Sequence, residues 1–246
     1  MDRKVAIVTG GSRGIGAATA RFLVRDGWAV AINYIANAAA AEKVAAELGG
    51  QGGETMLVQA DTASEADVTR LFDEVAAKWG RLDGLVNNAG MVGPRGKLEA
   101  LTLDAIERVL AVNVTGYMLC ARAAVRRMST SHGGNGGVIV NVSSGAAHRG
   151  GANDNILYAV SKGAVNSLTI GLSQEVAGEG IRVNTVAPGL TRTDMPSPDA
   201  LATHGPTIPI GRVGEAEEIA EGIAWLMSDQ ASYVAGANLR IAGGRI

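Results

Sequence analysis

The chain has 246 residues, of which 47% are hydrophobic and 19% charged, and its formal net charge at pH 7 is −2. This composition excludes an intrinsically disordered chain, and the 34 glycines follow no Gly-X-Y period, which excludes a collagen-like one. The nearly balanced charge argues against a nucleic-acid-binding surface or attraction to an anionic membrane.

The cysteine content and the first residues suggest where the protein works. A single cysteine, Cys120, cannot form an intramolecular disulfide and suits a reducing compartment. The apolar run Val5–Val8 is too short for the core of a signal peptide, and no run reaches the length of a membrane span. We therefore expect a cytoplasmic protein with neither a membrane nor a nucleic-acid partner.

Short apolar runs alternate with helical patterns along the whole chain. The predicted strands are Val5–Thr9, Trp28–Tyr34, Thr55–Gln59, Gly84–Asn87, Val138–Ser143, Arg182–Ala187 and Asn238–Ala242. The predicted helices are Ile15–Asp26, Ala38–Leu48, Glu65–Trp79, Leu103–Met128, Asn155–Glu179 and Glu215–Ser228. Most strands lack in/out alternation, as do strands buried on both faces of a parallel sheet. The pattern predicts an α/β fold in a single domain, residues 1–246: a doubly wound (Rossmann) parallel sheet of about seven strands with helices on both faces.

Two helices carry further signals. Ser64-Glu65-Ala66-Asp67 has the form of a capping box at the start of the third predicted helix. The helix Asn155–Glu179 is apolar nearly all round its axis, so every side of it must be covered. We expect one side to pack on the sheet and the other on a second subunit; burial under loops of the same chain is the alternative.

The first strand runs into the glycine-rich turn Thr9-Gly10-Gly11-Ser12-Arg13-Gly14-Ile15-Gly16, which opens a helix. Glycines in such a turn let backbone N–H groups approach a pyrophosphate at the positive end of the helix. A glycine-rich turn alone is a weak signal, but this strand–turn–helix context favours nucleotide binding over a structural turn.

The end of the second strand indicates which dinucleotide binds. An NAD site places a carboxylate there, yet the segment reads Asn33-Tyr34-Ile35-Ala36-Asn37 and the next acid is Glu42. Arg13 supplies a fixed cation able to bind a phosphate, with a solvated surface charge as the alternative. The pattern favours NADP(H) over NAD(H). The missing acid also argues against a methyltransferase that uses S-adenosylmethionine.

Tyr158 and Lys162 lie four residues apart in a predicted helix and therefore on one face. A tyrosine has a pKa near 10 in water, and a nearby cation in a low-dielectric site lowers it by stabilising the phenolate. The pair is therefore a candidate for proton exchange, or else a simple contact on the helix surface.

Further polar residues follow the central strands, where ligands bind in doubly wound sheets. Ser143 and Ser144 end the fifth predicted strand, and Asn87-Asn88-Ala89-Gly90 ends the fourth. Together these motifs resemble the short-chain dehydrogenase/reductase family over essentially the whole chain. The matching features are TGxxxGxG at Thr9–Gly16, Asp61, NNAG at Asn87–Gly90, Asn113, Ser144, YxxxK at Tyr158–Lys162, and Pro188-Gly189 with Thr191 and Thr193.

The resemblance implies roles for four catalytic residues. Tyr158 would be the general acid/base, and Ser144 would hold and polarise the substrate oxygen. Lys162 would lower the pKa of Tyr158 and bind the nicotinamide ribose, while Asn113 would position a water that connects Lys162 to solvent. Hydride would pass directly between cofactor and substrate.

The resemblance also implies the cofactor contacts. Asp61 and Thr62 would meet the adenine, Asn88 the adenosine ribose side, and Pro188–Thr193 the nicotinamide end. The expected contacts are Gly10, Ser12, Arg13, Gly14, Ile15, Gly16, Asn33, Tyr34, Asp61, Thr62, Asn88, Ala89, Gly90, Tyr158, Lys162, Pro188, Gly189, Thr191 and Thr193. No metal site is expected.

The chain departs from the family pattern at two places. Ser144 and Tyr158 are 14 positions apart where the family commonly has 13, with the extra residue in the loop His148–Asn155. Thr62 stands where the family usually has Val. The segment at about 189–213 matches the family's mobile substrate lid, and we leave His148 and His204 outside the catalytic set.

Several functions remain open. The first is an NADP(H)-dependent carbonyl reductase, or alcohol dehydrogenase, acting on a small molecule as a homotetramer. Alternatives within the family are a 3-oxoacyl-[acyl-carrier-protein] reductase and a glucose-type sugar 1-dehydrogenase. A carrier protein is acidic and needs a basic landing surface. Arg126 and Arg127 would contribute to one, whereas Glu175 and Glu179 would oppose it. A non-catalytic NADP-binding sensor is the alternative from another class.

Overall fold

The computed structural model describes residues 3–245 of the chain. The strands of the main sheet are β1 Val5–Val8, β2 Ala29–Tyr34, β3 Thr55–Gln59, β4 Gly84–Asn87, β5 Gly137–Val142, β6 Ile181–Pro188 and β9 Asn238–Ile241. The α-helices are α1 Gly14–Arg25, α2 Ala38–Gly50, α3 Glu65–Trp79, α4 Leu103–Leu110, α5 Gly116–Met128, α6 Ala146–Arg149, α7 Ile156–Val176, α8 Pro198–His204 and α9 Ala216–Met227.

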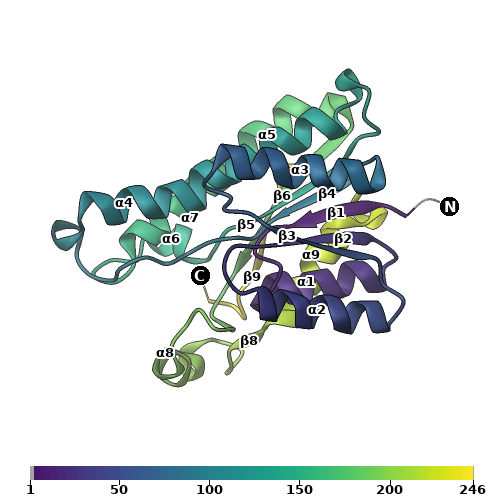
Figure 1. Cartoon of the computed structure of the whole chain (residues 1–246). Coiled ribbons are helices and arrows are strands. Elements are labelled where there is room, and N and C mark those ends of the chain that lie inside the picture. The colour runs from purple at the N-terminus through teal and green to yellow at the C-terminus, as the bar shows by residue number, and fades with distance from the viewer. Residues whose placement is uncertain (1–2, 246) are drawn as a thin grey trace.

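The seven main strands form one sheet in the order β3-β2-β1-β4-β5-β6-β9, and every neighbouring pair is parallel. Helices α3, α5 and α7 cover one face and α1, α2 and α9 the other (Figure 1). The order reverses between β1 and β4, the switch point at which doubly wound sheets bind ligands. This is the predicted fold, with each strand boundary within one residue of its expected place.

Two apolar layers hold the helices on the sheet. On the first face, Leu71 and Phe72 of α3 pack with Cys120 of α5 against strand side chains. On the second, Leu23 of α1 and Ile223 of α9 pack in the same way. Because both faces are covered, the strands read as continuous apolar runs rather than alternating ones.

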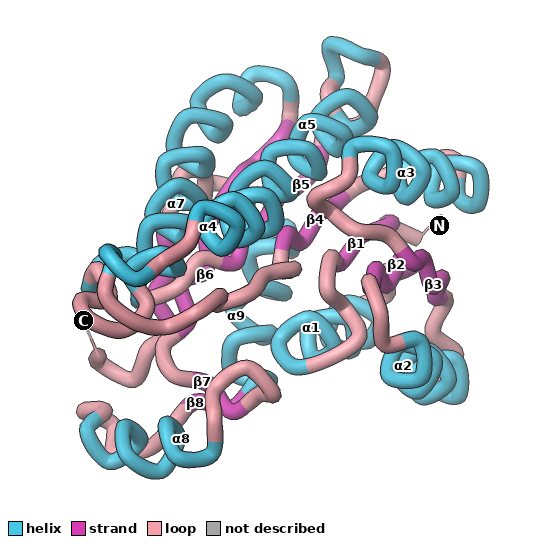
Figure 2. The backbone as a smooth tube through the Cα atoms, turned by 60° about the vertical axis from the view of Figure 1, so that its left-hand side comes forward, coloured by secondary structure: helices cyan, strands magenta, loops and turns pink. Residues whose placement is uncertain are grey.

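A small unit lies outside the main sheet, at its carboxyl edge. Strands β7 (Thr191–Arg192) and β8 (Gly214–Glu215) pair in parallel, and α8 lies on the chain between them. Figure 2 shows this unit standing apart from the sheet, next to the beginning of α1. It occupies the segment predicted as a lid. Within residues 3–245, no helix combines the length and apolar character needed to cross a membrane.

Two expectations about the helices need correction. The predicted helix Leu103–Met128 is α4 and α5 joined by a π-helical stretch, Ala111–Thr115, labelled η2. The capping box at Ser64 is only half formed. The Ser64 hydroxyl accepts from the Asp67 N–H at 3.3 Å, but the Asp67 carboxylate accepts from the Asp61 N–H at 2.8 Å instead of from the cap. The physical reason is that the Asp61 N–H, in the loop before the helix, takes the Asp67 carboxylate as its acceptor.

Beneath the carboxyl edge, a buried chain of hydrogen bonds links the central strands to α7. The Asn87 amide of β4 donates to Asn141 Oδ1 of β5 at 3.0 Å, and the Asn141 amide donates to Thr169 Oγ1 of α7 at 2.9 Å. Thr185 of β6 donates to the same Thr169 oxygen at 2.7 Å. Since all four side chains are buried, each relies on its neighbours for hydrogen-bond partners.

Replacing Thr169 with valine tests this network. The shape is preserved, but the Asn141 amide and Thr185 hydroxyl lose their acceptor, so we expect Thr169→Val to lower the free energy of unfolding by about 1–3 kcal/mol. The matched control is Thr69→Val on the exposed side of α3, because Thr69 also donates to the carbonyl four residues earlier, at 2.9 Å. The control should change stability by less than ~0.5 kcal/mol in the same urea titration. Equal effects from the two variants would contradict the network's importance.

Candidate active site

The glycine-rich turn is held open by close backbone packing. Gly10 has φ +61°, a conformation that favours glycine. A Cβ on Gly16 would lie 2.3 Å from the Gly10 oxygen and 2.6 Å from Asn88 Nδ2, so only glycine fits there. At the start of α1 the backbone is therefore free of side chains that would block a phosphate, as a phosphate-binding turn requires.

The first turn of α1 is uncapped. Its N-cap residue, Arg13, makes no capping side-chain bond, and no acid lies in the first turn of the helix. The positive end of the helix is therefore open to an anion. Ser12 and Gly14 flank Arg13 and are partly exposed, whereas Ile15 packs into the apolar layers. Arg13 itself forms an exposed ion pair with Asp194 of the lid, Nη1 to Oδ2 3.2 Å.

Asn33 and Tyr34 take different places at the end of β2. Asn33 is buried; its Oδ1 accepts from the Gly10 N–H at 3.2 Å and its amide donates to the Ala60 carbonyl at 2.9 Å. It ties the glycine turn to the end of β3, so its side chain faces the interior rather than the site. Tyr34 is partly exposed at the edge, and no acid stands beside it in the second strand.

Thr9, the first residue of the TGxxxGxG motif, links two turns of the site. Its hydroxyl accepts from the N–H groups of Asn88 at 2.9 Å and Ala89 at 3.0 Å. The Asn88 amide in turn donates to the carbonyls of Thr9 at 2.9 Å and Gly10 at 3.2 Å. The two turns therefore brace each other. A hydroxyl directly before the glycines was the available signal, but its partners lie about 80 positions away in sequence.

Asp61 and Thr62 stand after β3, next to the same edge. Asp61 Oδ1 accepts from the Ala63 N–H at 3.0 Å, and Oδ2 lies 3.5 Å from Arg108 Nη1. Thr62 is buried, and a Cβ on Gly116 would come within 3.0 Å of its carbonyl oxygen. Asp61 is thus oriented by its own loop and by α4, while Thr62 packs against the start of α5.

Ser144 and Tyr158 meet at the carboxyl end of β5. Tyr158 is partly exposed on the first turn of α7 and shares a hydrogen bond with the Ser144 side chain. Loss of hydration raises the pKa of Tyr158, and the bond to Ser144 opposes that rise. Ser144 Oγ also accepts from the Ala146 N–H at 3.1 Å, which fixes its position at the start of α6.

Lys162 lies buried one turn beyond Tyr158. Its Nζ donates to the Val142 carbonyl at 2.7 Å and to Tyr117 Oη at 3.0 Å, and it stands 5.8 Å from the centre of the Tyr158 ring. Burial lowers the pKa of Lys162 to about 7. An amine that has lost its water holds its proton less firmly than a solvated one.

Asn113 reaches this group from the π-helical stretch η2. Its Oδ1 accepts from the Met91 N–H at 2.9 Å, and its amide donates to the Met91 carbonyl at 2.8 Å and to Ser161 Oγ at 3.0 Å. Asn113 Oδ1 also lies near Gly90, where a Cβ would approach it to 3.2 Å and Lys162 Nζ to 3.5 Å. π-Turns are rare and recur at functional sites. Here the turn brings Asn113 beside Lys162, with the amide already bonded to protein groups.

The longer spacing between Ser144 and Tyr158 is absorbed in a turn after α6. Gly150, Gly151 and Asn153 all have positive φ, a conformation that glycine and asparagine tolerate. Asp154 closes the turn through an ion pair with Arg95, Nη1 to Oδ1 2.7 Å. The extra residue therefore changes the loop but leaves Tyr158 against Ser144.

The segment after β6 lies beside the C-terminal strand. The Pro188 carbonyl accepts from the Gly145 N–H at 2.9 Å, and the Gly189 N–H donates to the Ile241 carbonyl at 2.8 Å. Thr191 is buried, and the Thr193 side chain lies where a Cβ on Gly14 would meet it at 3.1 Å. The expected nicotinamide end thus adjoins both the Ser144 loop and the glycine turn.

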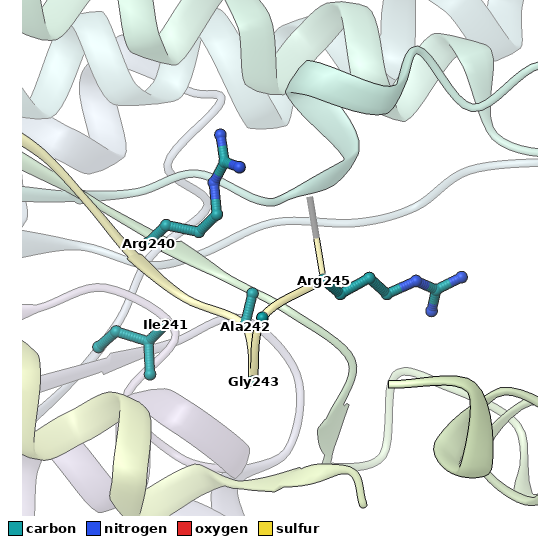
Figure 3. A pocket seen from close by; sticks show the side chains of 6 residues that line it. Arg240, Ile241, Ala242, Gly243 and Arg245 are labelled. Carbon is teal, nitrogen blue, oxygen red and sulfur yellow. The ribbon is translucent and has the colours of Figure 1, made fainter. Parts of the chain in front are cut away.

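A hollow of about 370 Å³ opens beside this segment, lined by Arg240–Arg245 (Figure 3). Arg240 and Arg245 extend from it in different directions, and its lining includes none of the four candidate catalytic residues. His148 and His204 are both exposed. The structure therefore brings Asn113, Ser144, Tyr158 and Lys162 together at one edge and leaves the histidines outside this group.

Comparisons with known proteins agree with this geometry. The family model described as enoyl-(acyl carrier protein) reductase matches residues 10–245. The uncharacterized oxidoreductase YgfF of Escherichia coli K12 is 47% identical over 98% of this chain and 99% of its own. The cis-4-hydroxycyclohexanecarboxylate dehydrogenase of Sinomonas cyclohexanicum is 43% identical over 98% and 96%. A Burkholderia cenocepacia short chain dehydrogenase, solved in complex with NADP, superposes with a TM-score of 0.91 at 40% identity over 98% and 97% of the chains.

The similarity extends over almost the whole chain, whether to the family, to the relatives or to the solved structure. It covers the glycine turn, the Ser144–Tyr158 contact and the lid in one alignment. The protein is therefore an oxidoreductase-type member of the short-chain dehydrogenase/reductase family.

Proposed function

We propose that the protein is a cytoplasmic NADP(H)-dependent oxidoreductase that interconverts a small carbonyl compound and its alcohol, with Tyr158 as general acid/base. The observation that carries the proposal is the placement of Tyr158 within reach of the Ser144 side chain, with the buried amine of Lys162 5.8 Å from the Tyr158 ring centre. A proton donor, a polarising hydroxyl and a cation thus converge on one point at the carboxyl edge of the sheet.

The residues around the glycine turn fit a phosphorylated dinucleotide. The uncapped start of α1 suits a pyrophosphate, and Arg13 suits a 2′-phosphate because its ion pair with Asp194 is exposed and contributes little to stability. The absence of an acid from β2 removes the group that would repel such a phosphate. The NADP complex of the Burkholderia cenocepacia relative supports the same choice. Bound NADP(H) would supply or accept the hydride.

In the reducing direction, Tyr158 Oη would give its proton to the substrate oxygen as that oxygen gains negative charge. Ser144 Oγ would donate a hydrogen bond to the same oxygen and hold the carbonyl in place. Lys162, when protonated, would stabilise the phenolate that remains on Tyr158, and Asn113 would help to return a proton to it. In the oxidising direction, the same groups would act in reverse order.

The alternatives receive less support. For a carrier-protein substrate, Arg127 is already ion-paired with Asp73, and Glu179 remains as an opposing charge. No contact in the described residues 3–245 is specific to a glucose-type sugar substrate. A non-catalytic sensor would have no need of the Ser144–Tyr158–Lys162 arrangement.

We also propose that the chain forms homo-oligomers, with the tetramer as the expected state, through the outer face of α5 and α7. Met118 on α5 and Val160 and Ile170 on α7 are more than half exposed. A hollow of about 520 Å³ between these helices is lined by Val114, Met118, Ala164, Val165, Ser167 and Leu168. A second subunit would cover this apolar face.

Removal of the Tyr158 hydroxyl tests the proposed reaction. We expect Tyr158→Phe to lower kcat with NADPH and a small ketone at least ~100-fold, because general acid/base catalysis contributes about 10²–10⁴-fold. Quenching of protein fluorescence by NADPH should give nearly the same Kd for both forms. Turnover that survives the substitution would refute the assigned acid/base, whereas a wild-type protein that binds NADPH but reduces no carbonyl compound would favour the sensor.

An acid at the end of β2 should change the cofactor preference. In Tyr34→Asp the carboxylate would repel a 2′-phosphate and accept from ribose hydroxyls, so the ratio of kcat/KM for NADPH over NADH should fall at least ~10-fold, about 1.4 kcal/mol. Tyr34→Phe, which adds no charge, is the matched control. An unchanged ratio in Tyr34→Asp would count against the reasoning from the second strand.

A charge on the outer face of α7 tests assembly. We expect light scattering to give a tetramer for the native chain and a smaller species for Ile170→Glu, because association would bury an unpaired carboxylate. Leu98→Glu, at an exposed apolar residue outside these helices, should leave the mass unchanged. A native chain that stays monomeric at micromolar concentration would overturn the proposal.

A further inference from the structure

Tyr117 is a buried tyrosine to which the family motifs assign no part. It lies on the first turn of α5, four residues after Asn113, and is 2% exposed. Its hydroxyl donates to the Val142 carbonyl at 2.9 Å and accepts from Lys162 Nζ at 3.0 Å. The hydroxyl group thus uses both its donor and an acceptor site inside the protein.

Lys162 depends on this hydroxyl for much of its environment. The amine donates to the Val142 carbonyl at 2.7 Å and to Tyr117 Oη, so Lys162, Tyr117 and Val142 close a triangle of hydrogen bonds. Its distance to the Tyr117 ring centre is 4.7 Å and to the Tyr158 ring centre 5.8 Å, so the amine stands between two phenols. An ammonium group has three N–H donors. Two are taken by this triangle and one remains.

Because Lys162 is buried, its charged form depends on the Val142 carbonyl and the Tyr117 hydroxyl as hydrogen-bond acceptors. Moving a charged amine away from water disfavours its protonated form, and a hydrogen-bond acceptor offsets this. The ionisable groups recorded around Lys162 are the phenols of Tyr117 and Tyr158, with the Cys120 thiol behind Tyr117. Burial raises the pKa of Tyr117 well above its ordinary value and that of Cys120 to about 12, so both stay neutral at working pH.

The packing of Tyr117 does not require its hydroxyl group. A phenylalanine would fill the same buried space and keep the ring beside Lys162. What a phenylalanine cannot do is accept from Nζ or fix that acceptor on the end of β5. Packing of the ring therefore does not explain the hydroxyl, whereas its hydrogen bonds to Lys162 and Val142 do.

We propose that Tyr117 is a positioning residue for Lys162: its hydroxyl, anchored on the Val142 carbonyl, holds the protonated amine beside Tyr158 and leaves one N–H for the reaction. This inference rests on the proposed function, because it gives Lys162 a charged role there. It adds a second phenol to the site, one that keeps its proton while Tyr158 exchanges its own.

The test is the titration of Lys162 in Tyr117→Phe. The chain has five lysines, so ¹³C-lysine labelling gives few signals, and Lys162→Arg identifies the one from Lys162. A hydrogen bond to a charged group is typically worth enough to move a pKa by about one unit. We expect the amine pKa of Tyr117→Phe to fall by about one unit below that of the native chain. The limb of the kcat–pH profile that reports the protonated amine should move to lower pH by a similar amount.

Cys120→Ala is the matched control, because Cys120 is equally buried on the same helix and no hydrogen bond to Lys162 is recorded for it. It should leave both the titration and the profile in place. The inference would be overturned if Tyr117→Phe left the Lys162 titration unmoved and lost only as much thermal stability as the control. Tyr117 would then contribute to packing alone. Tyr117→Met repeats the measurement if the phenylalanine variant does not fold.

The two proposals fail in different ways. If Tyr158→Phe keeps its activity, the proposed function falls, yet the NMR titration still shows whether Tyr117 holds the amine. If Tyr158→Phe is inactive and the titration and pH profile of Tyr117→Phe match the native chain, the proposed function stands and the positioning role falls.

Discussion

A lysine amine buried under the carboxyl edge of a parallel sheet is the constraint on which the rest of the site depends. Such a group needs acceptors, because it has lost its water. The end of β5 offers the Val142 carbonyl, and Tyr117 offers its hydroxyl. The hydrogen bond between Lys162 and Tyr117 therefore fixes both the position of α5 along α7 and its rotation about its own axis. The π-turn between α4 and α5 ends at Thr115, two residues before Tyr117, and allows Asn113 and Tyr117 to face the same region.

The residues beneath this edge form a base that is rigid because its polar groups are paired. Asn87, Asn141 and Thr185 join three strands to Thr169 of α7, and the Asn87 amide also donates to the Tyr117 carbonyl at 3.2 Å. Any shift of α5 or α7 along the sheet would break several buried hydrogen bonds at once. Low-dielectric surroundings make each such loss costly. The position of Tyr158 is thus set by polar contacts deep in the core as well as by apolar packing.

The sequence predicted the order of strands and helices because buried parallel strands and capped helices leave periodic, local signals. The four candidate catalytic residues also converge as expected. The π-turn left no such signal, because no proline interrupts the helical pattern of Leu103–Met128. The buried place of Asn33 was equally hidden: whether an asparagine turns inward or outward depends on partners such as Gly10 and Ala60, which only the fold brings near. Tyr117 was passed over for the same reason.

The contacts of the lid contrast with those of the edge. Arg13 and Asp194 meet in an exposed ion pair, and Thr193 rests against Gly14, so the lid touches the glycine turn through surface groups. Exposed pairs contribute little to stability, whereas the hydrogen bonds around Lys162 and Thr169 are shielded from water. Local stability in proteins follows such differences. The candidate catalytic residues therefore stand on buried, hydrogen-bonded parts of the fold, whereas the segment predicted as a lid meets the glycine turn through exposed groups.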